Sequence, residues 1–236
     1  MAGPAGDTLF AVVGAGPSLD YSRMVITNLI AAGAHFLLSD SIAAAFLRLY
    51  PHSRTTVFTV ELRRHAYLTR ICRISRFDVL AYAKAHERNL RVGPACRVTR
   101  FKLRGESGDF IELYSPGTVL GVMLSYAVTN ARPEAEIHVI GGDFTFIDNQ
   151  VYARFIDPHA PQVDRLRTRE HWQYEMALKK TGGLVMKSGI AVRTSFELMQ
   201  ARENMRAFVD ALPPSMRVIE YSPIGFETER IEKRLP

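Results

Sequence analysis

The sequence predicts an α/β fold, a doubly wound and mostly parallel sheet with helices on both faces and a helical lid after the strand that ends in GGDF. Short apolar runs alternate with amphipathic stretches, which is the pattern of β–α units. Glycine-rich turns follow the first of these runs and the run before GGDF. At 236 residues the chain can bury one core, so we expect a single Rossmann-like domain over 1–236, with the lid at 145–181.

The expected elements each have a local signal. The first apolar run ends at Gly14, and the amphipathic stretch after it ends at Gly33, a residue type that terminates helices. Pro51 closes the next helix, and Pro116 is expected in the first turn of a later one, which proline suits. Strands are expected at 8–14, 34–40, 55–61, 108–115, 136–141 and 217–223, and helices at 21–33, 41–51, 78–89, 116–131, 164–181 and 194–212.

Composition excludes some classes of protein. Hydrophobic residues make up 47% of the chain and charged residues 23%, ordinary values for a globular domain. The two cysteines form no C-x-x-C, so neither a disulfide framework nor a structural zinc site is expected, and a reducing cytoplasm is the default compartment. The N-terminus lacks the features of a signal peptide, and no apolar run is long enough for a membrane span.

The net charge of +6 comes largely from clustered cations. The clusters lie at 63–76, 97–104 and 165–169. Solvated surfaces are the simplest interpretation of each cluster. Aromatic residues do not alternate with the cations as on a single-strand-binding platform, so nucleic acid is not an expected partner.

The stretch GAGPSLD can be interpreted in two ways. Gly14 and Gly16 would let the backbone approach a phosphate, with Pro17 holding the turn rigid and the next helix start offering amides. Alternatively it is a plain turn in which Ser18 or Asp20 caps a helix. A lone G-x-G does not decide between a phosphate site and a turn.

Two later turns repeat this pattern. In YSPGT, the residues Ser115, Gly117 and Thr118 could hold a phosphate or a ribose hydroxyl, or simply cap a helix. In IGGDF, Asp143 follows a buried strand and would need a ligand, a metal or a backbone partner if it is buried. Carboxyl ends of parallel strands meet at one edge of a sheet, so these turns are expected around one crevice.

The seven histidines have no metal-ligand spacing, so no metal site is expected. His159 and His171 lie in the polar stretch after GGDF. Each could be a general base or a surface histidine.

Together, GAGPSLD, SPGTV and IGGDF resemble one superfamily in order and spacing. It contains the motility-accessory-factor (Maf) flagellin glycosyltransferases and the archaeal-type 6-hydroxymethylpterin diphosphokinases, and more distantly the bacterial sialyltransferases that use CMP-sialic acid. The C-terminal stretch RTSFELMQ…RVIEYSPIGFE is similar to the end of the Maf domain. The resemblance covers most of the chain, and residues 60–105 match least.

The resemblance implies a transferase with a nucleotide pocket. The favoured reaction is transfer of a CMP-activated nonulosonic acid to flagellin or a surface glycan, with no required cofactor. Tyr152 would stabilise the leaving phosphate, and His171, or His159 in its place, would be the base. The oligomeric state, including a homo-oligomer, is left open. The nucleotide-binding residues implied are Gly14, Gly16, Pro17, Ser18, Asp40, Ser115, Gly117, Thr118, Gly142, Asp143 and Phe144.

Two other functions compete with glycosyl transfer. A pterin diphosphokinase would use ATP and Mg²⁺, but its aspartate-rich motif is reduced here to LLSDS, with the single aspartate Asp40. A non-catalytic nucleotide-binding accessory protein is the third, because Thr145 replaces the tyrosine that follows Asp-Phe in the sialyltransferases.

Overall fold

The computed structural model describes residues 7–60, 77–85, 96–145, 153, 183–187, 190–226 and 228–234. Within them lies a nine-stranded sheet in the order β11-β10-β7-β1-β2-β3-β4-β5-β6, in which every neighbouring pair is parallel. The strands are β1 (Asp7–Val13), β2 (His35–Ser39), β3 (Thr55–Thr59), β4 (Asp78–Tyr82), β5 (Arg97–Leu103), β6 (Ile111–Leu113), β7 (Ala131–Ile140), β10 (Arg217–Glu220) and β11 (Ile231–Lys233).

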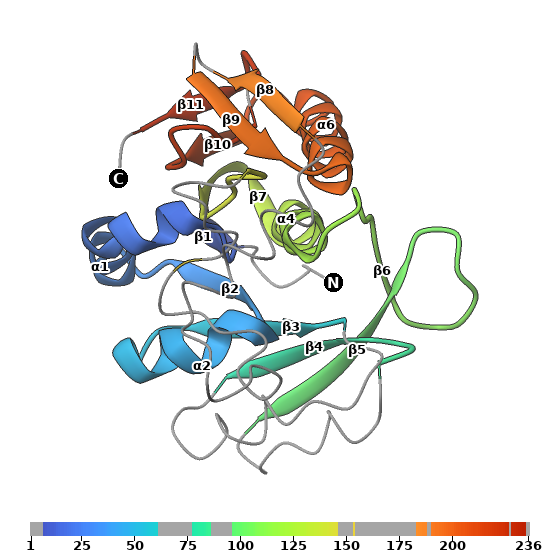
Figure 1. Ribbon diagram of the computed structural model, residues 1–236. Coiled ribbons are helices and arrows are strands. Elements are labelled where there is room, and N and C mark those ends of the chain that lie inside the picture. Colours follow the sequence, from blue (N-terminus) through green and yellow to red (C-terminus); the bar gives the residue numbers. More distant parts are fainter. Residues whose placement is uncertain are drawn as a thin grey trace, which may run out of the picture.

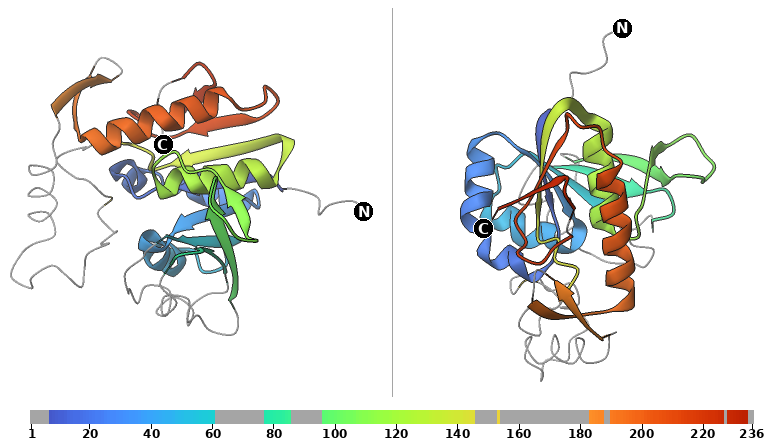
Figure 2. Two further views of the ribbon diagram at one scale, coloured as in Figure 1. Left: turned by 90° about the vertical axis from the view of Figure 1, so that its right-hand side faces the viewer. Right: turned by 90° about the horizontal axis from the view of Figure 1, so that it is seen from above.

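Helices cover both faces of the sheet, so the predicted α/β class is confirmed. Figures 1 and 2 show α1 and α2 on one face and α4 and α6 on the other. The β8–β9 hairpin leads directly into α6. The α-helices are α1 (Arg23–Ala31), α2 (Asp40–Leu49), α4 (Val119–Asn130) and α6 (Phe196–Asp210), and a short 3-10 helix, η1 (Pro17–Tyr21), precedes α1. The strands of the hairpin are β8 (Gly183–Lys187) and β9 (Ile190–Thr194).

The chain reverses direction in the sheet beside β1. From β1 it runs outward through β2 to β6, then returns through α4 to β7 on the other side of β1. Connections therefore leave β1 and β7 in opposite directions, and open α/β sheets bind ligands beyond the carboxyl ends of strands at such a point.

One expected helix is a strand. Residues 78–89 were expected to be helical, but Asp78–Tyr82 form β4, between β3 and β5. Val79, Leu80 and Ala81 are all buried because helices and loops cover both faces of a central parallel strand. A short continuous apolar run does not distinguish such a strand from a buried helix.

The helix expected at 116–131 begins later than its proline. Thr118 is the N-cap and Val119 the first helical residue, so Pro116 precedes the cap instead of lying in the first turn. A Cβ on Gly121 would lie 2.1 Å from the Pro116 ring, so the proline packs on the first turn from outside. Strands β5, β8, β9 and β11 had no sequence prediction, and the helix expected at 164–181 lies outside the described residues.

The cation cluster at 97–104 lies on and just after β5, and three of its members have carboxylate partners. Arg97 is 3.6 Å from Asp78, while Lys102 and Arg104 are 3.8 and 3.9 Å from Glu112. These ion pairs agree with a solvated surface. Over the described ranges, no helix combines the length and the apolar character that crossing a membrane requires.

Candidate functional site

The floor of the site is a backbone-to-backbone contact between the turns that follow β1 and β7. The Gly14 amide donates to the Ile140 carbonyl at 2.7 Å, and the Gly16 amide donates to the Gly141 carbonyl at 3.0 Å. A Cβ on Gly14 would lie 2.4 Å from the Gly141 oxygen, and Gly141 itself has φ +68°. These glycines are therefore required by the contact between the two turns, whatever the pocket binds.

Asp143 fastens the same two turns and a third segment. Its side chain is 1% exposed, and its Oδ2 accepts the Ser18 amide at 2.8 Å. Its Oδ1 accepts a hydrogen bond from the hydroxyl of Ser222, a residue that follows β10. A Cβ on Gly16 would lie 2.4 Å from Oδ2, so the glycine makes room for the carboxylate. Asp143 thus accepts hydrogen bonds from a backbone amide and from a side-chain hydroxyl of the protein. Of the three partners that the sequence left open, namely a ligand, a metal and the backbone, the structure shows the backbone partner.

Two helix starts form the walls. The side chain of Thr118 accepts the Gly121 amide at 3.2 Å, which leaves the amides of Val119 and Leu120 without acceptors inside the helix. Opposite, Ser39 is the N-cap of α2, and its hydroxyl lies 2.8 Å from that of Ser41. Helix N-termini carry partial positive charge, which favours an anion most clearly at α4, because the first turn of α2 contains the carboxylate of Asp40.

The floor and walls enclose a pocket of about 320 Å³. That is the lower end of the size range of small-molecule sites. Its lining residues are Gly14, Ala15, Gly16, Ser39, Ser41, Thr118, Val119, Leu120, Gly141, Gly142, Asp143, Phe144, Thr145 and Leu198.

The structure separates the implied binding residues into two groups. Those that line the pocket are Gly14, Gly16, Thr118, Gly142, Asp143 and Phe144. Those outside the lining are Pro17, Ser18, Asp40, Ser115 and Gly117.

The second group contacts other parts of the protein. Pro17 and Ser18 are buried in η1, and the Ser18 amide donates to Asp143. Asp40 accepts the Thr59 hydroxyl at 2.7 Å and so points toward β3. The Ser115 hydroxyl accepts the Gly117 amide at 3.4 Å in the turn before α4, and Gly117 has φ +103° there. The catalytic candidates Tyr152, His159 and His171 lie outside the described residues.

Sequence reasoning missed some lining residues. Ser39 and Ser41 flank Asp40 at a strand end that the sequence had singled out, and the lining includes these two serines but not Asp40. Leu198 comes from α6, about 55 residues after the GGDF turn, and nothing local in the sequence connects it with the pocket.

The described lining is suited to binding. Its one ionisable side chain is Asp143, which accepts hydrogen bonds from Ser18 and Ser222. Backbone amides and the hydroxyls of Ser39, Ser41 and Thr118 can hold an anion, but within the described ranges no lining group is placed to move a proton.

Fold and site together define an α/β protein with a small pocket beside two helix starts, at the point where the sheet reverses direction. Among solved structures, the chain is similar to a structure described as a Maf glycosyltransferase from Magnetospirillum magneticum AMB-1, with a TM-score of 0.66 and 14% identity. That match covers 99% of this chain and 34% of the other, so this chain spans about a third of the solved one. At this identity the likeness shows a shared fold. No protein-family model and no curated protein matches the chain.

Proposed function

We propose that this protein is a glycosyltransferase that binds a nucleotide-activated sugar in the pocket between β1, β7 and α4. The observation that carries the proposal is the pocket itself, formed by two helix starts and two glycine turns at the carboxyl ends of β1, β2 and β7. The fold shared with a Maf glycosyltransferase supports the same class of reaction.

The phosphate is assigned to the side of the pocket where α4 begins. Val119 and Leu120 offer amides there, and Ser39 and Ser41, at the junction of β2 and α2, add hydroxyl groups to the same lining. Phe144 and Leu198 supply apolar surface for the base or sugar. This division matches small-molecule sites, in which a few polar groups orient a ligand held mainly by apolar contact.

We further propose that the donor is a CMP-activated nonulosonic acid and the acceptor is flagellin or a surface glycan. The motifs GAGPSLD, SPGTV and IGGDF support this finer assignment. Tyr152 would then stabilise the departing CMP phosphate and His171, or His159, would accept the proton of the attacking hydroxyl. Neither role requires a cofactor, and we place the reaction in the cytoplasm.

A nucleotide panel measured by thermal shift tests the proposal. At about 100 times its Kd, a ligand of the native state stabilises by about 2.7 kcal/mol, which raises the Tm of a chain this long by about 5–10 °C. We expect CMP and CDP to give such a shift. A large shift with ATP and Mg²⁺ but none with cytidine nucleotides would replace the proposal with the diphosphokinase.

A pair of variants ties binding to this pocket. Ser41→Phe places a ring in the lining and should abolish the CMP shift. Thr27→Phe likewise replaces a hydroxyl side chain by a phenyl ring, on the exposed surface of α1, and should leave the shift intact. Equal responses of the two variants would place the nucleotide elsewhere.

Transfer is tested separately, by release of CMP from a CMP-activated sugar. His171→Ala and Tyr152→Phe should each reduce the release at least tenfold, because general-base catalysis contributes about 10²–10⁴ and a lost hydrogen bond to the developing phosphate charge costs about 10²–10³. Binding of CMP with turnover unaffected by either variant would indicate the non-catalytic accessory protein.

A further inference from the structure

An ion pair with a buried carboxylate lies next to the pocket. The side chain of Glu220, the last residue of β10, has no exposed surface. The Lys233 ammonium of β11 is 2.8 Å from its Oε2, and the Phe226 amide donates to its Oε1 at 3.3 Å. A Cβ on Gly225 would lie 1.6 Å from that Oε1, so the loop after β10 is shaped around the carboxylate.

This pair connects to the pocket by two routes. A Cβ on Gly142, which lines the pocket, would lie 3.5 Å from Glu220 Oε1, so the carboxylate lies next to that turn. Lys233 also donates to the Ser222 carbonyl at 3.3 Å, and the Ser222 hydroxyl donates to Asp143. Asp143 in turn holds the Ser18 amide.

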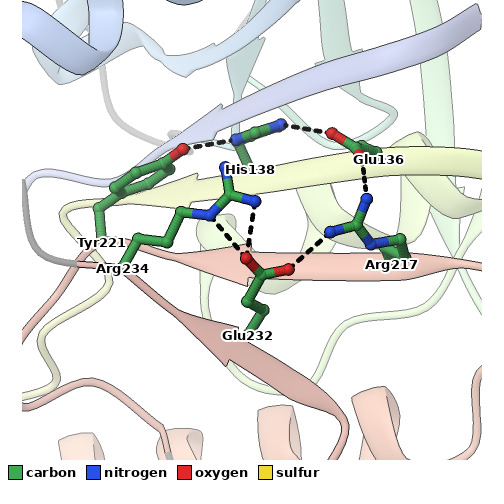
Figure 3. Close-up of polar contacts among 6 residues, drawn as sticks. All are labelled: Glu136, His138, Arg217, Tyr221, Glu232 and Arg234. Carbon is green, nitrogen blue, oxygen red and sulfur yellow. Dashed lines mark hydrogen bonds and ion pairs between the residues drawn. The ribbon is translucent and has the colours of Figure 1, made fainter.

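The two faces of β11 have different roles. Lys233 lies on the face of the core that contains Val218 and Ile231. Glu232, on the opposite face, bonds Arg217 and Arg234 at 2.6 Å in a network that continues through Glu136 to His138 and Tyr221 (Figure 3). This network fastens β11 and β10 to β7, and its bonds among the described residues involve no residue of the pocket lining, so Glu232 provides a control for Glu220.

We propose that Glu220 is a positioning residue of the pocket, which acts through Lys233, Ser222 and Asp143 to hold the Gly16–Ser18 turn in its binding shape. The role in nucleotide binding rests on the proposed function. A buried carboxylate is costly unless it is paired. Here the Lys233 ammonium both pairs with Glu220 and donates to the Ser222 carbonyl, in the segment whose hydroxyl holds Asp143.

Whether Glu220 is ionised or protonated determines whether Lys233 stays beside the Ser222 carbonyl. When ionised, it holds Lys233 beside the Ser222 carbonyl; when protonated, it loses the ion pair and releases a lysine whose side chain is already 34% exposed. Two charged groups act on Glu220, Lys233 from β11 with opposite charge and Asp143 from the turn after β7 with like charge. Burial raises the pKa of Glu220 to about 7.

The first test needs no nucleotide. In the free wild-type protein, the NMR signal of the Ser18 amide should shift with pH through a midpoint near 7, because this amide reports on Asp143. The shift should vanish in Glu220→Gln and persist in Glu232→Gln. A Ser18 signal that stays constant from pH 6 to 8, or that moves equally in Glu220→Gln, would overturn the proposal.

The second test measures CMP affinity at pH 6 and pH 8. Binding that favours ionised Glu220 weakens as pH falls, and we expect a loss of about fivefold, the low end of coupling between sites. The titration of CMP itself is common to all variants, so the additional pH dependence should disappear in Glu220→Gln and Lys233→Met. If CMP fails to bind while the NMR signal of the Ser18 amide still follows the titration of Glu220, the proposed function fails and the positioning role stands.

Discussion

The two ends of the sheet both bury polar groups, yet they differ in what those groups can do. At the amino end, His35 Nδ1 is 3.0 Å from Asp7 and Nε2 is 2.8 Å from the Thr56 hydroxyl. A hydroxyl, an imidazole and a carboxylate in this order also form the triad of many hydrolases. Thr56 is 3% exposed between neighbouring strands, however, so no substrate can reach its hydroxyl.

The carboxyl end has the opposite character. Its described lining holds little ionisable chemistry, but it encloses about 320 Å³ beside two helix starts. Access and backbone orientation, more than the presence of reactive residue types, therefore distinguish the candidate site from the closed polar cluster.

The largest expected effect comes from adding a methyl group to the floor of the pocket. In Gly141→Ala the new Cβ lies 2.6 Å from the Gly14 oxygen at φ +68°, so we expect a loss of about 4 kcal/mol from left-handed strain and overpacking. Gly33→Ala shares the positive φ but has nothing within 4 Å, and should lose about 1 kcal/mol. Urea unfolding measures both; equal losses would show that the contact between the turns carries no special constraint.

Asp143→Ala is the next largest change. It leaves the Ser18 amide and the Ser222 hydroxyl buried without their acceptor, at a cost of about 3 kcal/mol. Asp210→Ala, on the surface of α6, should change stability by less than about 0.5 kcal/mol. CMP binding should be lost in Asp143→Ala even at temperatures where the variant remains folded. Retained binding would mean that the Gly16–Ser18 turn keeps its shape unaided.

Thr56→Val tests the closed cluster at the amino end. It removes the hydroxyl that contacts His35, so we expect a loss of about 1 kcal/mol and an unchanged Kd for CMP. A tenfold change in that Kd would show that the polar cluster at the amino end of the sheet is coupled to the pocket at the carboxyl end.

The smallest net effect is on the pH dependence of stability, because the two ends oppose each other. Burial lowers the pKa of His35. Burial acts to raise the pKa of Asp7, but hydrogen bonds from Arg54 and His35 outweigh this effect, so the pKa of Asp7 is lowered. The unfolded chain therefore binds both protons more readily: His35 loses stabilisation as pH falls below about 6.5, and Asp7 only as pH falls below about 3.8. The raised pKa of Glu220 acts in reverse, since the folded state holds its proton and is stabilised as pH falls from about 7 toward 4.5.

Glu220→Gln separates these contributions. The variant should lose stability on going from pH 7 to pH 5 more steeply than the wild type, as measured by the free energy of unfolding in urea at each pH. Identical pH profiles would argue against a raised pKa at Glu220.

The local sequence determined the class of fold. The alternation of apolar runs with amphipathic stretches predicted the strands near β1, β2, β3 and β7, and the glycine turns predicted which end of the sheet carries the site. These features depend on short-range physics, namely chain periodicity and backbone freedom at glycine. Gly33, at φ +77° just after α1, is an example in which residue type alone was enough.

The tertiary structure decided what each group contacts. The sequence left a ligand, a metal or a backbone partner open for Asp143, and the fold brings Ser18 and Ser222, which are 125 and 79 residues away, to its carboxylate. Asp40 faces Thr59 while its serine neighbours face the pocket. Such choices depend on the neighbours that parallel crossovers bring together, and local sequence contains no information about those neighbours because they are set by strand order and packing.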